Sequence, residues 1–307
     1  MLPIGRLDMA IDLALNQGVT LCTYGDALRV PASKGLSLLK AKAQGADVRM
    51  VYSPADALKL ARTHSELKVV FLAIGFETTA PATAVVLSDA AQTQTPNFSV
   101  LCNHVLTPSA MQAIVDGADR GETAQIDGFI GPAHVSIIIG TQAYEPFARL
   151  HRKPVVIAGF EPLDVLQAIA MLIRQINQGR SEVENEFIRA VDSEGNRKAK
   201  DWLNDVFELR DEFEWRGLGT ISRSALRIKA PFLNWDAEHR FDLKAKSVKD
   251  HKACECGAIL RGVKQPRDCA IFGTVCTPEQ PVGSCMVSSE GACAAHYQYG
   301  RFRIASA

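Results

Sequence analysis

Short apolar runs alternate with amphipathic stretches along the first two thirds of the chain. The apolar runs are mostly rich in Val and Ile, as buried parallel strands are, and they lie at residues 19–24, 48–52, 68–74, 98–103, 128–139 and 154–158. The stretches between them show helical periodicity, and several carry Pro or Ser near the first turn. These stretches lie at residues 36–44, 54–63, 81–93, 108–116 and 163–174. The alternation predicts open parallel α/β sheets.

The same pattern divides the chain into three parts. Residues 1–96 are predicted to form one α/β domain, which ends in the linker-like sequence AQTQTPN, and residues 97–229 a second α/β domain. Within the second, residues 178–214 are heavily charged and are expected to form solvated helices. After Pro231 the Val- and Ile-rich runs stop, and Cys, Gly and Pro become dense. Residues 230–307 are therefore predicted to be a small Cys-rich domain that needs a metal or a similar staple to hold it.

The charge balance and the lack of long apolar runs exclude several function classes. Lys and Arg together number 34, and so do Asp and Glu, which gives no indication of binding to nucleic acid or to a membrane surface. No apolar run reaches the roughly 18 residues that span a bilayer, and the first residues lack the pattern of a secretory signal. Glycine-rich phosphate loops are also absent. We therefore expect a cytoplasmic protein with no nucleic-acid partner and no membrane partner.

The cysteines are distributed unevenly. Cys22 and Cys102 stand alone, whereas the other six lie close together: Cys254, Cys256, Cys269, Cys276, Cys285 and Cys293. In a reducing compartment such a group indicates metal binding or redox chemistry rather than a disulfide framework. Four thiolates satisfy a [4Fe–4S] cluster, and two further cysteines can form a redox-active dithiol beside it. Four thiolates also bind zinc, but zinc ribbons usually carry C-x2-C pairs, which this chain lacks. The spacing favours iron–sulfur and leaves zinc as the alternative.

Seven blocks of unusual sequence run in order along the chain. The last three are WRGLGTISRSAL at 215–226, CECGAILRG at 254–262 and the Cys-rich stretch at 268–299, and the earlier ones are GFETTAP, CNHVLTP, GPAHVSIIIG and GFEPLDVLQAI. Together they resemble the HypD family. HypD-like proteins help to build the Fe(CN)2CO group of [NiFe] hydrogenases. The resemblance implies a redox-active assembly scaffold, rather than a turnover enzyme, that works with a HypC-like chaperone and receives cyanide by way of a HypE-like donor.

The resemblance also implies roles for the clustered cysteines. The family's pattern for a [4Fe–4S] cluster matches four positions: Cys254, Cys269, Cys276 and Cys293. The two left over, Cys256 and Cys285, match a dithiol/disulfide pair beside the cluster, and Glu290 is a candidate proton donor or hydrogen-bonding group near that pair. Gly283 permits a tight turn that can bring Cys285 back toward Cys256. Because Cys254 and Cys256 are separated by one residue, the spacing does not decide which of the two is the ligand.

One part of the HypD pattern is missing from residues 1–307. In HypD-like proteins the sequence seen here follows an N-terminal segment with a CGGH-type motif, whose cysteine holds the iron under construction, and a CPVC-type redox motif. A shortened chain, a late gene start or a degraded copy would each account for this. The transient iron with CN and CO ligands is thus expected of the complete family protein. Two other functions stay open: a stand-alone iron–sulfur electron-transfer or disulfide-reducing protein, and an inactive remnant.

Several polar residues follow the predicted strands. Ligands of open α/β sheets bind at the carboxyl ends of the strands, where Glu77, His104 and His134 are expected. Each of them either lines such a cleft or is a buried structural group with its hydrogen bonds satisfied. Thr79 is expected to cap the helix that begins near Pro81.

Overall fold

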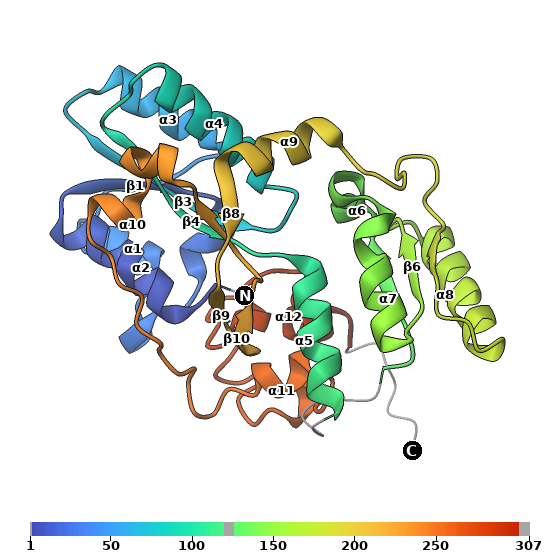
Figure 1. Ribbon diagram of the computed structural model, residues 1–307. Coiled ribbons are helices and arrows are strands. Elements are labelled where there is room, and N and C mark those ends of the chain that lie inside the picture. The colour runs from blue at the N-terminus through green and yellow to red at the C-terminus, as the bar shows by residue number, and fades with distance from the viewer. Residues whose placement is uncertain (1, 120–125, 301–307) are drawn as a thin grey trace.

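The computed structural model describes residues 2–119 and 126–300. Its largest sheet has four strands in the order β2-β1-β3-β4, all parallel (Figure 1). Their bounds are β1 Val19–Thr23, β2 Val48–Met50, β3 Lys68–Gly75 and β4 Phe98–His104. In β3, Val69 and Phe71 face one core cluster, whereas Val70 and Leu72 face the other, as the two-residue period of a strand requires. The predicted buried parallel strands are confirmed here.

Helices cover both faces of this sheet. On the Phe71 face lie α3 (Pro54–Thr63) and α4 (Ala80–Gln92), and on the opposite face lie α1 (Ile4–Asn16) and α2 (Leu38–Ala43) (Figure 1). The short turns η1 (Gly25–Arg29) and η2 (Ser33–Gly35) lie between β1 and α2. The sheet is therefore the middle layer of a three-layer unit, with apolar side chains on both faces.

Local signals explain why some helix bounds were predictable. Helix α3 covers the predicted range because Ser53 and Asp56 form a capping box and Pro54 occupies its first turn. Helix α1 is not among the predicted elements. Nevertheless, Leu7, Ala10 and other residues of its buried face follow helical spacing and pack into the core.

Residues 197–240 return to the first sheet. They form α9 (Arg197–Val206), β8 (Phe207–Leu209), β9 (Glu212–Trp215), β10 (Gly219–Ser222), β11 (Leu226–Ile228), η4 (Ala230–Trp235) and α10 (Ala237–Arg240). Val206, Ile228 and Trp235 join the core cluster that contains Phe71. Strand β4 also begins beyond residue 96 yet pairs with β3, so the first sheet crosses the expected boundary at 96/97. The three domain ranges stay predictions, because the strands of the first sheet come from both sides of the expected boundary.

A buried ion network locks this return in place. The Arg6 guanidinium of α1 donates to Glu238 of α10 and to the carbonyl of Cys102 in β4. Arg210 donates to both oxygens of the same carboxylate. Burial opposes ionisation of Glu238, but Arg6 and Arg210 overcome that cost and hold its pKa at about 2. The network ties the first helix, the last strand of the sheet and a segment more than two hundred residues away along the chain.

A second parallel sheet has three strands in the order β5-β6-β7. Its elements are α5 (Thr107–Asp119), β5 (Phe129–Pro132), α6 (Ala133–Ile139), η3 (Thr141–Tyr144), α7 (Glu145–His151), β6 (Val155–Ala158), α8 (Pro162–Asn177) and β7 (Val183–Asn185). Helix α8 turns several large apolar side chains, including Leu163, Leu166 and Ile173, toward solvent. None of the helices in the described part of the chain is long and apolar enough to cross a membrane.

Two expectations for this region are wrong. The apolar run at 128–139 forms a four-residue strand and then helix α6, because Pro132 cannot donate to the sheet and instead precedes a helix whose Ser136 hydroxyl donates back to the Pro132 carbonyl. The charged segment 178–214 forms strands β7, β8 and β9 besides helix α9. In β9 the side chains of Phe213 and Trp215 are buried, whereas those of Glu212 and Glu214 are more exposed.

The Cys-rich part has little regular structure. From Cys254 to the last described residue, 300, its helical segments are short: α11 (Cys256–Leu260), η5 (Pro266–Asp268), η6 (Ser284–Met286) and α12 (Ala292–Tyr299). Its core cluster is made largely of cysteines, with Ile259, Met286 and Ala294 beside them. Two parallel sheets followed by such a module confirm the predicted fold class, α/β with a small Cys-rich domain at the end.

Candidate thiol and metal centre

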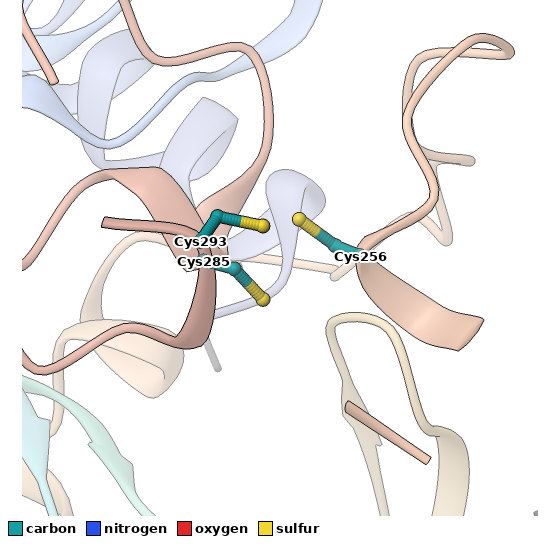
Figure 2. Close-up of side chains that lie close together, drawn as sticks. All are labelled: Cys256, Cys285 and Cys293. Carbon is teal, nitrogen blue, oxygen red and sulfur yellow. The ribbon is translucent and has the colours of Figure 1, made fainter. Parts of the chain in front are cut away.

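Three cysteine sulfurs meet in the Cys-rich module. Cys256 begins α11, Cys285 lies in η6 and Cys293 lies in α12, and their Sγ atoms are all within 4.8 Å of one another. Figure 2 shows Cys256 pointing from one side of the gap and Cys285 and Cys293 from the other. All three side chains are buried. Segments that are distant along the chain therefore supply three soft ligands to one point.

A close backbone approach brings a fourth sulfur to this group. Gly283 lies so near the Sγ atoms of Cys254 and Cys256 that a Cβ atom at this position would overlap both of them. Its φ of −105° is available to any residue. Glycine is thus required for the close contact with sulfur rather than for the turn that the sequence suggested. The thiols of Cys254 and Cys256 are also hydrogen-bonded to each other.

The remaining two clustered cysteines lie apart from this group, in the same core. The Cys269 thiol faces the Ala253 carbonyl at 3.7 Å, and the Val282 N–H donates to the Cys276 sulfur at 3.3 Å. Both side chains are buried. The structure brings together Cys256 and Cys285, the expected dithiol, and adds Cys293 to them. The close group of three sulfurs does not include Cys254, Cys269 or Cys276, and the proposed ligand set of the cluster stays a prediction.

Hydrogen bonds between thiols polarise the group. The thiols of Cys256 and Cys293 donate to Cys285 and lower its pKa to about 4. The Cys254 thiol likewise lowers the pKa of Cys256, while the pKa of Cys254 itself is raised by its bond to Cys256 and by burial. The pKa of Cys293 is raised by its bonds to Cys256 and Cys285. A group that stabilises thiolates is suited to metal ligation and to disulfide exchange.

Glu290 lies at the surface of the module. Its backbone N–H donates to the Ser288 hydroxyl, and the next residue, Gly291, packs against the Cys285 carbonyl. The loop that carries Glu290 is therefore close to Cys285 along the backbone. Its role as a proton donor stays a prediction.

The module is fastened to the rest of the molecule by a buried cation. Arg216, in the turn between β9 and β10, donates to the Asp250 carboxylate at 2.6 Å and to the Pro31 carbonyl at 2.6 Å. Gly217 lies in the same turn, and Gly257 of α11 lies so close to it that a Cβ atom on Gly257 would be 2.8 Å from the Gly217 carbonyl oxygen. The turn 215–219 thus packs directly on the first residues of α11 and positions Cys256.

Comparison with known sequences decides the family. The model of the HypD family, described as "Hydrogenase formation hypA family", matches residues 1–300. The chain belongs to the HypD family. Its blocks WRGLG and CECGAI meet in space at the Gly217–Gly257 contact, which gives a physical reason for their occurrence together.

Curated HypD proteins are similar over nearly the whole chain. The "Hydrogenase maturation factor HypD" of Cupriavidus necator is 64% identical over 304 residues, which cover 98% of this chain and 80% of that protein. The Azotobacter vinelandii protein of the same name is 63% identical over 305 residues, covering 99% and 80%. The Escherichia coli K12 protein is 45% identical over 298 residues, covering 97% and 79%.

The polar residues at strand ends in this HypD-family chain have structural roles. The Glu77 carboxylate accepts from the backbone N–H and the hydroxyl of Thr107, at 2.8 and 2.9 Å, and its pKa is raised by burial. His104 is fully buried, bonds to Thr83, and has its pKa lowered to about 3 by burial. Thr79 stands at the start of α4, but its hydroxyl donates to the carbonyl of Ile74 rather than capping the helix.

His134 differs from these groups because it lies at the start of α6 and is exposed. Its ring packs against that of Phe160, with 5.1 Å between ring centroids. Arg216 was expected from the sequence to pair with an acidic group or a cyanide-derived ligand, with a structural ion pair as the commoner outcome, and the structure shows the ion pair with Asp250. Sequence reasoning did not identify Gly257 or Asp250 as partners of the turn 215–219, because both lie far from it along the chain.

Proposed function

We propose that this hydrogenase maturation factor carries a [4Fe–4S] cluster and a redox-active dithiol in its Cys-rich module, and that the centre serves assembly of the Fe(CN)2CO group. The proposed cluster ligands are Cys254, Cys269, Cys276 and Cys293. Cys256 and Cys285 are the proposed dithiol. The iron that receives CN and CO is cargo of the complete family protein. The proposed partners are a HypC-like chaperone and a HypE-like cyanide donor, and the proposed compartment is the cytoplasm.

The position of Cys293 carries the proposal. Its sulfur lies within 4.8 Å of both sulfurs of the dithiol, and in the family pattern it is a cluster ligand. The dithiol and the cluster would therefore meet at Cys293. The donor set also fits the cofactor, because thiolates are the ligands of iron–sulfur clusters and the core of the module is built largely of buried cysteines.

The chain's own residues prepare the dithiol for exchange. Hydrogen bonds from Cys256 and Cys293 favour the thiolate of Cys285, and Gly283 leaves room for the Cys256 sulfur. Oxidation of the two thiols to a disulfide releases two electrons and two protons, and reduction consumes the same number. A bound [4Fe–4S] cluster supplies electrons one at a time. We assign Glu290 the transfer of a proton at this pair.

Disulfide mapping tests the proposal. The anaerobically purified full chain is oxidised with ferricyanide, alkylated, digested and analysed by mass spectrometry. We expect a Cys256–Cys285 disulfide that dithionite reverses, that Cys285→Ser abolishes and that Cys22→Ala leaves intact. Because the sulfurs of Cys256, Cys285 and Cys293 all lie within 4.8 Å of one another, a disulfide that includes Cys293 is the alternative outcome. Its appearance as the main product would contradict the assignment of Cys293 as a cluster ligand.

A further inference from the structure

A wide groove separates the first α/β layer from the Cys-rich module. Its volume is about 750 Å³, within the range of ligand-binding sites. One wall is formed by residues 29–40, which run from η1 into α2, and the other by residues 275–282 of the module. Val248 and Lys249, in the segment that leads to the module, also line it. The groove is distinct from the three-sulfur group, which lies inside the module.

The rim of this groove is strongly basic, although the chain as a whole has no net charge. The groove is lined by Arg29, Lys34, Lys40, Arg216 and Lys249, with Glu279 as its acidic residue. Arg216 is neutralised by Asp250. Arg29 and Lys40 instead donate to backbone carbonyls, those of Pro278 and Gly35, which carry no charge. Four cations against one carboxylate leave an excess positive charge that a bound anionic group would balance.

Apolar side chains lie among these cations. Leu39 lies in one wall of the groove and Val275 in the other, and their side chains are 49% and 62% exposed. Leu36, Val248 and Val282 line the groove too and are half-buried. A small inorganic anion would leave these apolar side chains in water. An extended polypeptide in which acidic and apolar side chains alternate would satisfy both features, since its successive side chains point to opposite sides.

We propose that this groove is the docking site for an acidic, apolar-bearing segment of a partner protein. Two features of the groove indicate this ligand: its excess positive charge complements acidic side chains, and its exposed apolar side chains complement apolar ones. A bound segment would contact the loop 275–282, whose Val282 N–H donates to the Cys276 sulfur. The proposal goes beyond the cluster and the dithiol. It holds whether the module contains iron or zinc, because no groove cation is a metal ligand.

A binding assay with defined probes tests the docking proposal. The probe is a fluorescein-labelled peptide in which glutamates alternate with valines, and its counterpart carries lysine in place of each glutamate. When the full chain is added, the fluorescence anisotropy should rise for the glutamate peptide but not for the lysine peptide. The affinity for the glutamate peptide should fall as salt is added. Equal binding of both peptides, or binding of neither, would overturn the proposal.

Two pairs of variants locate the binding. We expect the double substitution Lys40→Glu and Lys249→Glu to lower the affinity for the glutamate peptide by about tenfold or more. The matched control, Lys59→Glu with Lys198→Glu, makes the same change of charge on exposed positions of α3 and α9 and should leave the affinity unchanged. Equal losses in both pairs would show a non-specific charge effect and would overturn the site.

The apolar half of the proposal has its own test. The double substitution Leu39→Ser and Val275→Ser should lower the affinity for the alternating peptide but not the affinity for a peptide made only of glutamate. Displacement of the alternating peptide by equimolar inorganic pyrophosphate would show that the groove is a small-anion site and would contradict the proposal. Circular dichroism of every variant confirms that the fold is retained, since all four substituted side chains are exposed.

Discussion

The molecule contains two kinds of buried cysteine, and their surroundings differ. Cys22 and Cys102 lie in the strands of the first sheet among apolar side chains. Burial raises the pKa of Cys22 to about 12 and that of Cys102 to about 11. In the Cys-rich module the thiols are nearly as buried, yet hydrogen bonds from neighbouring thiols lower the pKa of Cys285 to about 4. In the sheet, burial keeps the cysteines as thiols, whereas in the module hydrogen bonds from neighbouring thiols favour the thiolate of Cys285.

The same contrast extends to what holds each region together. The first sheet is stabilised by two apolar clusters and by the Arg6–Glu238–Arg210 network. In the core of the module, most of the buried residues are cysteines, and few are aliphatic. Removing the proposed metal should therefore affect one region, and breaking the ion network should affect the other.

Metal removal should have the largest effect. Bound metal in a module of this kind contributes folding free energy on the order of 10 kcal/mol. Chelation under anaerobic conditions should remove most protection from hydrogen exchange in α11 and α12, while β3 keeps its protection. Mass spectrometry of peptic fragments measures both regions in one experiment. Equal loss of protection in β3 would show that the two regions do not fold separately.

Breaking the ion network should have the next largest effect, in the opposite region. Glu238→Ala leaves Arg6 and Arg210 without their shared carboxylate, and we expect a loss of about 3–5 kcal/mol from the free energy of unfolding. The pKa of Glu238 is held at about 2, below its ordinary 4.5. Its contribution is therefore complete above about pH 4.5 and is lost as the pH falls toward 2.

Urea denaturation at neutral and acid pH measures this prediction. The difference in midpoint between the natural chain and Glu238→Ala should shrink in acid. The iron content of the variant should stay unchanged, because Glu238 lies outside the module. A variant that loses iron as well would show that the two regions depend on each other.

Adding a methyl group to Gly283 should have a smaller, local effect. The new Cβ atom would overlap the sulfurs of Cys254 and Cys256, and overpacking of this kind costs about 1–3 kcal/mol. We expect Gly283→Ala to slow formation of the Cys256–Cys285 disulfide. Gly25→Ala is the matched control, because the added methyl would meet only the flexible Met50 side chain. An unchanged rate of disulfide formation in Gly283→Ala would contradict the claim that glycine is needed here to make room for the two sulfurs.

The two cysteines of the sheet should show the smallest effect. In the native protein at about pH 8, iodoacetamide should leave Cys22 and Cys102 unmodified, because their raised pKa values keep them as thiols. After chelation the module thiols should be labelled under the same conditions. Peptide mapping gives both results, and early modification of Cys102 would contradict the assignment of a packing role.

The sequence predicts those elements whose signals are local. Strand β3 and helix α3 could be predicted because a buried strand and a capped helix each reveal themselves within ten residues or so. Strand β4 was also predicted, but not that it pairs with β3, since sheet membership depends on long-range packing. The run at 128–139 shows a related limit, because its apolar content suits both a strand and a buried helix.

The candidate site divides in the same way. The grouping of six cysteines could be read from spacing, and the resemblance to the HypD family implied the pairing of Cys256 with Cys285, but neither predicted the position of Cys293 beside them. That position depends on how η6 and α12 pack against α11. Gly283 was assigned to a turn, whereas its role is to make room for sulfur, and nothing in the local sequence distinguishes the two.

The most direct test of the central claim is metal analysis of four proteins purified anaerobically. These are the natural chain, Cys276→Ala, Cys22→Ala and Cys102→Ala. The account predicts about four iron and four acid-labile sulfide per chain in the natural protein and in both sheet variants, with loss of both in Cys276→Ala. One zinc per chain without sulfide, or iron that survives Cys276→Ala and disappears with Cys22→Ala, would contradict it.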